Sequence, residues 1–460
     1  MNLKDDFILS KINEGYLVGG AVRDFLMGKE PIVDRDIAIK GAENFAHKLE
    51  QDFDGTFIPL DEENKIYRVV LSDKVNYIDV TELQGNTIEE DLQRRDFKIN
   101  AIAYNLKTKE FIDPLNGRND IKNKILSHIK DENFKEDPLR ILRAFRFIAV
   151  TGFEPTEDLK NAITKYKNLI LLPSKERIMY EIMKLFGGEY CSKTLLLMDE
   201  FGILEDIFPC VKEFKQVPPN SHHHLDLFHH LIETVRNIEF LYQEASPQEQ
   251  EHLNKTDFGG FPRINHLKLA GFLHDLGKFS TWTIEETTGR HRFIKHDDVG
   301  AKMCVPILRD LKFSKKQIEY ISFMIKNHIY PSNVIASPEL SEKVMMRYLR
   351  KTGDNVIDNI YLAKADRLSA RGQDITEEII KSNIEGLDKL LKFYFDKKES
   401  LKPLPKLLDG NEIMKILNIS PSHKLGEIID ALKEAQISGD VNNIDEAISF
   451  VKKASHSIAK

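Results

Sequence analysis

Two aspartates separated by one residue, Asp34 and Asp36, constrain the fold of this chain more than any other feature of its sequence. In a β-strand, residues two apart point to the same face. Both carboxylates would therefore project together, while Arg35, Ile37 and Ile39 take the opposite side. The pattern predicts a strand with one acidic face. Hard divalent cations prefer such oxygens, so this face can hold Mg²⁺.

A diglycine precedes the two aspartates at Gly19 and Gly20. Without side chains, these residues let backbone N–H groups approach a triphosphate, and a helix expected from about Ala21 adds its positive end. Arg23 can add a charge-assisted contact. Each fragment alone is more often a plain turn. Together they predict a Mg²⁺-dependent nucleotidyl-transfer site, in which Asp34 and Asp36 are catalytic.

A row of polar residues with a spacing of three begins at Asp137 and continues through Arg140, Arg143 and Arg146. On a helix starting near Pro138, this row forms a slowly turning ridge. Apolar residues between them, such as Leu142, Phe145 and Ala149, can pack into a core. The ridge itself would face a ligand or solvent.

The segments around these residues resemble those of a known family. Leu17–Asp24 followed by Asp34–Ile37 resembles the first motif of the class II tRNA nucleotidyltransferase and poly(A) polymerase family, a branch of the polymerase beta-like superfamily. Four later segments resemble its further motifs in the same order: Arg94–Ala101, Asp113–Gly117, Glu136–Phe147 and Ser174–Ile178. The resemblance implies Mg²⁺ in the head and tRNA, CTP and ATP as partners.

The resemblance also implies roles for individual residues in nucleotide binding. Arg95 and Asn100 would hold the sugar and phosphates, and Asp137 and Arg140 would select the base. Cytosine and adenine both present an amine beside an unprotonated ring nitrogen, which a carboxylate and a guanidinium can read. Guanine and uracil present the reverse pattern. Arg143 and Arg146 would hold phosphates or orient the selecting pair, and Ser174–Ile178 would be structural.

One departure from the family concerns a loop. CCA-adding members carry a flexible loop between the first two motifs, but here a strand at Tyr77–Thr81 passes through Glu82–Asn86 almost directly into Thr87–Leu92. Members that lack the loop include enzymes that add only the two cytidines. CCA addition, CC addition, A-only addition and poly(A) synthesis all stay open.

The second half of the chain has a different pattern. His274-Asp275 follows an apolar run at Leu267–Leu273, and together with His230 and Asp366 it gives the ligand order of HD-type phosphohydrolases, which this region resembles. Further ligands of two-metal members would be His296 and His328. Imidazole with carboxylate suits Mn²⁺, Fe²⁺, Ni²⁺, Co²⁺ or Zn²⁺. The resemblance implies hydrolysis of 2′,3′-cyclic phosphates and phosphomonoesters. Histidines scattered in a helical core are the alternative.

Periodicity and length predict the organisation. Residues 1–125 mix strands and helices, and the rest is dominated by helical periodicity, so we expect an α+β fold with a polymerase beta-like head followed by a helical body. The predicted parts are the head at 1–125, a neck at 126–215, an HD domain at 221–370 and a helical tail at 371–460 that could contact tRNA. The stretch Glu244–Pro262 is expected to be a loop within the HD domain.

Composition limits the function further. The net charge of −7 gives no general support for nucleic-acid binding, so any RNA contact must be local. No apolar run approaches the length of a membrane span and the N-terminus does not resemble a secretory signal, which predicts a cytoplasmic protein.

The sequence therefore predicts a tRNA nucleotidyltransferase that adds C and/or A to tRNA 3′ ends, with an HD phosphohydrolase in the same chain. One alternative is a poly(A) polymerase or an A-adding enzyme. The other is an HD phosphohydrolase with a non-catalytic head that binds nucleotide or RNA. The presence of both Asp34 and Asp36 argues against this last alternative.

Overall fold

The computed structural model describes residues 3, 6–29, 34–337, 340–398 and 405–457. The described chain divides into two compact units. The first unit contains the chain up to Val211 together with Asp310–Phe313, and the second contains Lys212–Arg309 and the chain from Ser314 onward. Each unit has its own arrangement of elements.

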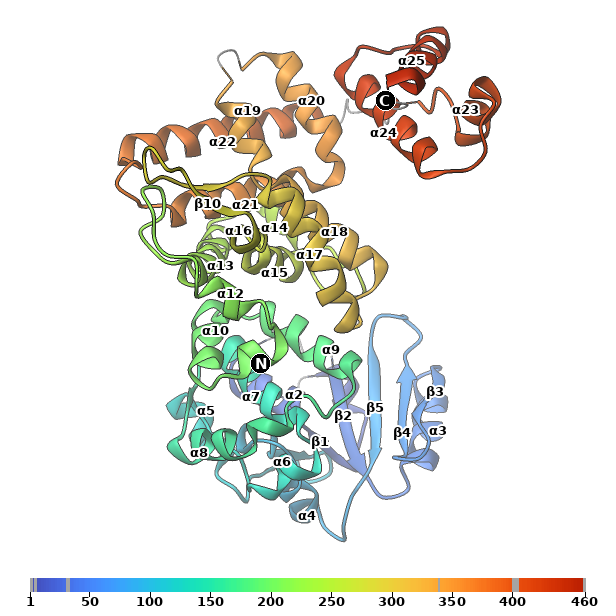
Figure 1. The fold of residues 1–460 in the computed structure, drawn as a ribbon. Coiled ribbons are helices and arrows are strands. Elements are labelled where there is room, and N and C mark those ends of the chain that lie inside the picture. The colour runs from blue at the N-terminus through green and yellow to red at the C-terminus, as the bar shows by residue number, and fades with distance from the viewer. Residues whose placement is uncertain (1–2, 4–5, 30–33, 338–339, 399–404, 458–460) are drawn as a thin grey trace. The chain divides into compact units, whose positions relative to one another are not determined.

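A mixed sheet forms the centre of the N-terminal part of the first unit (Figure 1). Among the described residues it has seven strands in the order β3-β4-β5-β2-β1-β6-β7. β2 and β5 run parallel, and the other neighbouring strands are antiparallel. The strands are β1 (Tyr16–Val18), β2 (Asp34–Ile39), β3 (Thr56–Asp61), β4 (Ile66–Val70), β5 (Tyr77–Glu82), β6 (Ala103–Asn105) and β7 (Phe111–Ile112).

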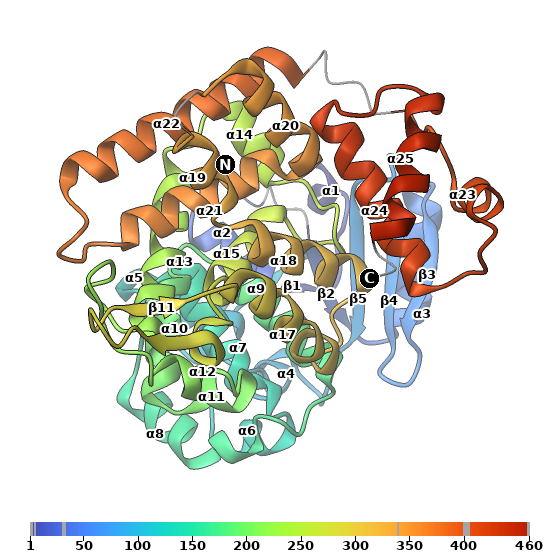
Figure 2. The same ribbon diagram turned by 45° about the horizontal axis from the view of Figure 1, so that its top comes forward.

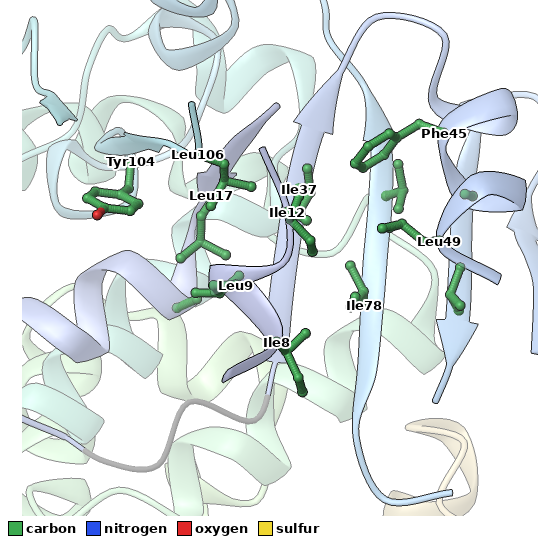
Figure 3. Close-up of a cluster of buried hydrophobic side chains, with 14 of the residues drawn as sticks. Ile8, Leu9, Ile12, Leu17, Ile37, Phe45, Leu49, Ile78, Tyr104 and Leu106 are labelled. Atoms are coloured by element: carbon green, nitrogen blue, oxygen red, sulfur yellow. The ribbon is translucent and has the colours of Figure 1, made fainter. Parts of the chain in front are cut away.

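Alternation along the strands gives the sheet two different faces. Leu17, Ile37 and Ile78 are fully buried in one apolar cluster, to which α1 and α3 also contribute residues (Figure 3). Burial of one such side chain contributes about 1.5–3 kcal/mol. The predicted alternation of Ile37 with Asp36 is therefore confirmed, since Ile37 is in the core and Asp36 lines a cavity. On the other face, Val18 and Ala38 pack with residues of α4 in a smaller cluster.

Helices surround the sheet and continue into the remainder of the first unit. Several begin at a side-chain cap, as at Thr87, Thr156 and Ser174, whose hydroxyls accept a backbone N–H of the first turn. The helices are α1 (Phe7–Ser10), α2 (Gly20–Leu26), α3 (Ala42–Asp52), α4 (Ile88–Gln93), α5 (Gly117–Asn123), α6 (Glu132–Glu136), α7 (Leu139–Thr151), α8 (Glu157–Tyr166), α9 (Lys175–Phe186), α10 (Cys191–Glu200) and α11 (Ile203–Ile207). Short strands β8 (Ile125–Leu126) and β9 (Glu154–Pro155) pair in parallel.

The second unit is built almost entirely of helices. Its helices are α12 (Val211–Phe214), α13 (Leu227–Gln243), α14 (Pro247–Leu253), α15 (Arg263–Leu273), α16 (Lys278–Thr281), α17 (His296–Asp310), α18 (Lys315–Asn327), α19 (Tyr330–Ile335), α20 (Glu342–Thr352), α21 (Val356–Ser369), α22 (Glu377–Lys397), α23 (Gly410–Leu417), α24 (His423–Ser438) and α25 (Ile444–Ser457). Every residue of α15 is buried, and α15 packs against α13, α18 and α21. This central helix leads directly to His274.

Two features of the second unit differ from those predicted from the sequence. A short antiparallel hairpin, β10 (Trp282–Ile284) and β11 (His291–Phe293), follows α16. The expectation of a loop over Glu244–Pro262 was wrong in part, because α14 lies within it. Ser246 and Glu249 form a capping box at the start of α14, and this signal is visible in the sequence.

The last three helices, α23, α24 and α25, pack on one another around an apolar core of their own (Figure 2). Fully buried Ile413 and Ile428 belong to this core. None of the described helices is both long enough and apolar enough to cross a lipid bilayer.

Candidate active sites

The first unit contains a cavity of about 860 Å³, here called the main cavity. Its lining residues come from the diglycine, β2, the segment after α4 and helix α7. The predicted nucleotide-site residues that line it are Gly19, Gly20, Arg23, Asp36, Arg95, Asn100, Asp137, Arg140, Arg143 and Arg146. Asp34 begins β2, but its side chain lies outside the described part of the structure.

The diglycine shapes the wall of the main cavity. Gly19 caps helix α2 with φ of 70°, a left-handed value that favours glycine. A Cβ atom at this position would lie 3.3 Å from Asp36 Oδ2 and 3.4 Å from Arg95 Nη1. The missing side chain therefore leaves room where a carboxylate and a guanidinium approach the backbone. This chemistry fits a divalent cation and the phosphates of a nucleotide.

Asp36 also has an acidic neighbour on the adjacent strand. In the parallel pairing of β2 with β5, Asp36 lies opposite Asp79. Arg68 donates two hydrogen bonds to the Asp79 carboxylate, at 2.7 and 2.8 Å. Asp79 is thus already neutralised by a bidentate ion pair.

Asp96 holds two of the predicted nucleotide-binding residues in place. Its buried carboxylate accepts hydrogen bonds from Asn100 Nδ2 at 2.9 Å and from Arg143 Nε at 2.8 Å. Burial alone would raise the pKa of Asp96, but Arg143 and the Asn100 hydrogen bond outweigh it and lower the pKa to about 2. Asn100 Oδ1 in turn accepts from Arg23 Nη1 at 2.9 Å. Asp96 was not among the site residues predicted from the sequence.

Helix α7 presents its arginines as predicted. Leu142, Phe145 and Ala149 are buried in the core, while the polar ridge lines the main cavity. Buried Glu181 of α9 lies 3.5 Å from Arg143 Nη1 and 3.1 Å from Arg146 Nε.

Phe147 provides a second anchor for the arginines. The guanidinium carbons of Arg23, Arg143 and Arg146 lie 5.1, 5.5 and 4.3 Å from the centre of its ring. These distances fall within the range of cation–π attraction. Phe147 lies on α7, four positions after Arg143, whereas Glu181 comes from α9 and could not be identified as a partner from local sequence.

The two residues expected to select the base are held by different partners. Asp137 Oδ2 accepts a hydrogen bond from Arg177 Nη2 at 2.8 Å. Arg140 donates to the backbone carbonyls of Asn133 and Arg94, at 3.1 and 2.9 Å. Arg177 lies in the segment that was expected to be structural, yet it also lines the main cavity.

The connection between β5 and α4, here called the β5–α4 connector, consists of residues 83–87. It is tied to α4, because Gln84 N–H donates to Asp91 Oδ1 and Asn86 N–H donates to Glu90 Oε2. Gly85 has φ of 82°, and Glu90 atoms fill the space where its Cβ would lie. The connector is a short, well-bonded turn.

The predicted HD residues lie together in the second unit and form the histidine cluster, comprising His230, His274, Asp275, His296, His328 and Asp366. Among the described residues, two groups could each hold a metal ion: His230, His274 and Asp275, and Asp275, His296 and His328. Asp275 Oδ2 lies 3.4 Å from His230 Nε2 and 3.2 Å from His274 Nε2. Its Oδ1 lies 3.2 Å from His296 Nε2 and 3.6 Å from His328 Nε2.

Asp366 joins the first group, since its Oδ1 lies 3.2 Å from His230 Nε2 and 3.6 Å from His274 Nε2. Burial would lower the pKa of His274, but the Asp275 and Asp366 carboxylates raise it to about 10. A positive charge is thus strongly favoured at this position.

Backbone contacts orient the imidazoles of the histidine cluster. The Nδ1 atoms of His274, His296 and His328 bond the carbonyls of Gly271, Phe293 and Ile325 at 2.6–2.8 Å. Each Nε2 is thereby aimed inward, as in metal-ligating histidines. Among the described residues, His230 Nε2, His274 Nε2 and Asp275 Oδ1 are buried without a hydrogen-bond partner, whereas Asp275 Oδ2 lies 2.6 Å from Lys278 Nζ. Bare nitrogen and carboxylate atoms of this kind fit a divalent transition metal.

Comparison with known proteins places the chain in a family. The model of the poly A polymerase head domain matches residues 15–127, that of a probable RNA- and SrmB-binding site of polymerase A matches 152–215, and that of the HD domain matches 227–371. The A-adding tRNA nucleotidyltransferase of Deinococcus radiodurans is 30% identical over 442 residues, which cover 95% of this chain and 94% of that protein. The chain belongs to the tRNA nucleotidyltransferase and poly(A) polymerase family.

Two further comparisons agree with this assignment. The CC-adding tRNA nucleotidyltransferase of Thermus thermophilus is 29% identical and covers 97% of this chain and 95% of that protein. The crystal structure of the Bacillus stearothermophilus CCA-adding enzyme in complex with CTP has the same fold, with a TM-score of 0.55 at 21% identity over 97% of this chain and 94% of that chain. This chain is therefore a tRNA nucleotidyltransferase of the CCA-, CC- or A-adding type, with an HD domain.

Proposed function

We propose that this nucleotidyltransferase adds cytidines from CTP to tRNA 3′ ends and stops at CC. The observation that carries the proposal is the β5–α4 connector, which spans only residues 83–87 where CCA-adding members of the family carry a flexible loop. The similar Thermus thermophilus protein is a CC-adding enzyme. A-adding and poly(A)-synthesising activities are the rival outcomes.

In the proposed reaction, the 3′ hydroxyl of the RNA gives up its proton to solvent as its oxygen attacks the α-phosphorus of the nucleotide. The bond from that phosphorus to the oxygen bridging to the β-phosphate breaks, and pyrophosphate leaves. Asp34 and Asp36 would hold Mg²⁺, which when bound activates the attacking hydroxyl and stabilises the leaving group.

The residues of the main cavity would position the nucleotide for this step. Arg23 and Asn100, joined by their hydrogen bond, would contact the sugar and phosphates. Asp137 and Arg140 would read the base edge. Arg177 would orient the Asp137 carboxylate, so that it can accept from the exocyclic amine of cytosine.

The test uses tRNA transcripts that end before the tail, after one C and after CC, each supplied with CTP, ATP or both, followed by 3′-end sequencing. We expect addition to stop at CC. A complete CCA tail would overturn the proposal, as would an A added only to the CC-ended transcript or a long A tract. Asp36→Asn is the control, and extension that survives it would refute the assignment of the catalytic site.

We further propose that the HD domain hydrolyses 2′,3′-cyclic phosphates and phosphomonoesters at RNA 3′ ends. The observation in its favour is the histidine cluster, with its inward imidazoles and unpaired buried ligand atoms. With a cyclic phosphate, the oxygen of water bonds to phosphorus, one ribose–phosphorus bond breaks and the ribose oxygen takes a proton. A divalent metal, when bound by the cluster, lowers the pKa of water that attacks the phosphorus.

A hydrolysis assay with Mn²⁺, Fe²⁺, Ni²⁺, Co²⁺ or Zn²⁺ tests this second activity. Asp275→Asn removes the carboxylate that both candidate metal groups share, and we expect it to abolish hydrolysis. Hydrolysis that persists in Asp275→Asn would show that the histidine cluster is not the site. Asp36→Asn should retain hydrolysis, which separates this activity from nucleotide addition.

A further inference from the structure

A groove of about 450 Å³ lies beside the histidine cluster and is here called the hairpin groove. Its walls come from the β10–β11 hairpin and from the segment around Asn220–His223. His296 belongs both to the groove wall and to the histidine cluster, so the groove lies directly beside the candidate metal site. Many of the side chains that line the groove are cationic or carry an imidazole ring, namely His222, His223, Lys278, Arg290, His291 and Arg292. No carboxylate occurs among the described lining residues.

The inner end of the hairpin groove is marked by Lys278. This lysine is 7% exposed, and its Nζ lies 2.6 Å from Asp275 Oδ2 and 3.2 Å from His223 Nε2. Within the described part of the chain, the Nδ1 atoms of His223 and His291 are buried without a hydrogen-bond partner. The inner end of the groove thus carries an ammonium beside an imidazole, and a phosphate oxygen can accept from the ammonium.

The outer end is marked by Arg290. Its Nη2 lies 3.4 Å from His222 Nε2, so the guanidinium approaches the imidazole ring. Across the hairpin, Arg292 is instead paired with Glu285, and on the far side of His222 the Asp374 carboxylate lies 3.9 Å from Nδ1. Arg290 is therefore the arginine of the hairpin that is best placed to meet an anion in the groove.

We propose that the hairpin groove binds the phosphodiester next to the terminal group of an RNA 3′ end, so that the HD domain acts on an oligonucleotide rather than on a free mononucleotide. The inference rests on the proposed hydrolase function. The terminal phosphate would lie at the histidine cluster, near Lys278, and the groove continues outward to Arg290 with room for more than one phosphate. A second phosphate in an RNA strand is the anion that the outer cation would meet.

Hydrolysis kinetics test the proposal on the full chain loaded with metal. The substrates are a trinucleotide ending in a 2′,3′-cyclic phosphate and the 2′,3′-cyclic mononucleotide. We expect Arg290→Ala to raise KM for the trinucleotide about tenfold and to leave kinetics on the mononucleotide unchanged, because only the trinucleotide has a second phosphate. Arg290→Lys should recover part of the loss. Arg350→Ala, which removes an exposed arginine elsewhere in this unit, is the charge control.

Salt dependence gives a second readout. KM of the wild type for the trinucleotide should rise with salt more steeply than KM of Arg290→Ala, since one phosphate contact is missing in the variant. Equal KM values and equal salt slopes for Arg290→Ala and Arg350→Ala would overturn the proposal. An equal rise in KM for the trinucleotide and the mononucleotide in Arg290→Ala would also overturn the proposal, because it would indicate that Arg290 contacts the terminal phosphate.

A binding assay separates this inference from the hydrolase proposal. Fluorescence anisotropy of a labelled trinucleotide with a 3′-phosphate, which cannot be extended, compares Arg290→Ala with Arg350→Ala. Weaker binding by Arg290→Ala alone supports the groove even if the wild type hydrolyses neither substrate, in which case only the hydrolase proposal fails. Identical binding by the two variants would reject the groove.

Discussion

Asp96 shows how one buried carboxylate supports a whole binding wall. It contacts both Asn100 and Arg143, and Arg143 also lies near Glu181. Asp96→Asn keeps the shape but removes the charge. We expect a loss of about 3 kcal/mol in the free energy of unfolding, the low end of the range for breaking a buried ion pair, because Arg143 is partly exposed and keeps Glu181. Urea denaturation measures the change.

The control for this prediction is Asp206→Asn, which neutralises an exposed carboxylate of α11 in the same unit. Its effect should stay within about 0.5 kcal/mol. Equal urea midpoints for the two variants would show that the contacts of Asp96 contribute no more than an exposed charge.

His266 in the second unit provides a pH-dependent prediction. Burial lowers its pKa to about 4, and its Nε2 accepts a hydrogen bond from Gln317 at 3.1 Å, so the folded chain holds it neutral. Below pH of about 6.5 the unfolded chain binds a proton that the folded chain does not. Stability should therefore be complete above that pH and fall by up to about 1.4 kcal/mol per unit as the pH drops towards 4. Urea midpoints of wild type and His266→Gln between pH 7 and pH 5 should converge; parallel curves would contradict the prediction.

At the scale of single residues, most of the residues that line the main cavity could be predicted from the sequence, but the residues that hold them in place could not. Asp36, Asn100 and the α7 arginines were found because motif spacing and helical periodicity are local properties. Phe147 lies on α7 beside Arg146 and was not recognised as a contact of the arginines. Asp96 and Glu181 contact the α7 arginines from other parts of the chain, and such partners have no local signature. The pairing of Arg177 with Asp137 joins residues 40 positions apart and was missed for the same reason.

Among the elements, the start of α17 depends on a glycine in the turn before α16. A Cβ at Gly277 would lie 2.1 Å from the carbonyl oxygen of His296 and 2.7 Å from Gly300 N. Gly277→Ala must therefore push the start of α17 outward and carry His296 away from Asp275. We expect a destabilisation of about 1–3 kcal/mol, as in other overpacked sites, and a smaller number of Mn²⁺ ions bound per chain at equilibrium dialysis.

Gly426→Ala is the matched control, since nothing lies within 4 Å of the added Cβ in α24. Replacing a helical glycine there should be neutral or stabilising by up to about 1 kcal/mol. Unchanged Mn²⁺ stoichiometry in Gly277→Ala would show that α17 adjusts without moving His296.

The elements also show where periodicity stops being informative. The helix over α7 and the apolar helix before His274 were predicted because their patterns are long and regular. The β10–β11 hairpin was missed, since each of its strands has only three residues and no alternation can be read from so short a run. Helix α14 was missed because its composition is polar, although its capping box is local.

At the scale of the whole molecule, the two compact units should respond differently to a transition metal. The histidine cluster offers imidazole ligands, which bind Ni²⁺ more tightly than Mg²⁺-type oxygen sites do. A ligand that binds only the folded state stabilises it by about 2.7 kcal/mol at 100 times its Kd. Calorimetry after chelation should therefore show Ni²⁺ raising the melting transition of the second unit above that of the chelated protein.

His274→Ala should lose this Ni²⁺-dependent shift, and His423→Ala, which removes a histidine whose side chain is 93% exposed, should keep it. A shift that is the same in both variants would mean that Ni²⁺ binds outside the histidine cluster.

The β5–α4 connector has a consequence for how products diverge among relatives. Gly85, Asn86 and Thr87 are exposed, and the turn is followed at once by a helix that carries its own cap. Closing a longer loop adds only about 0.6 kcal/mol for each doubling of its length. Insertions or deletions in the connector can therefore accumulate during evolution with little effect on folding. The α7 arginines, which are held by several packed partners, tolerate less change. If the connector decides where addition stops, as in the proposed function, then the last nucleotide added would be one of the properties of such an enzyme that change most easily during evolution.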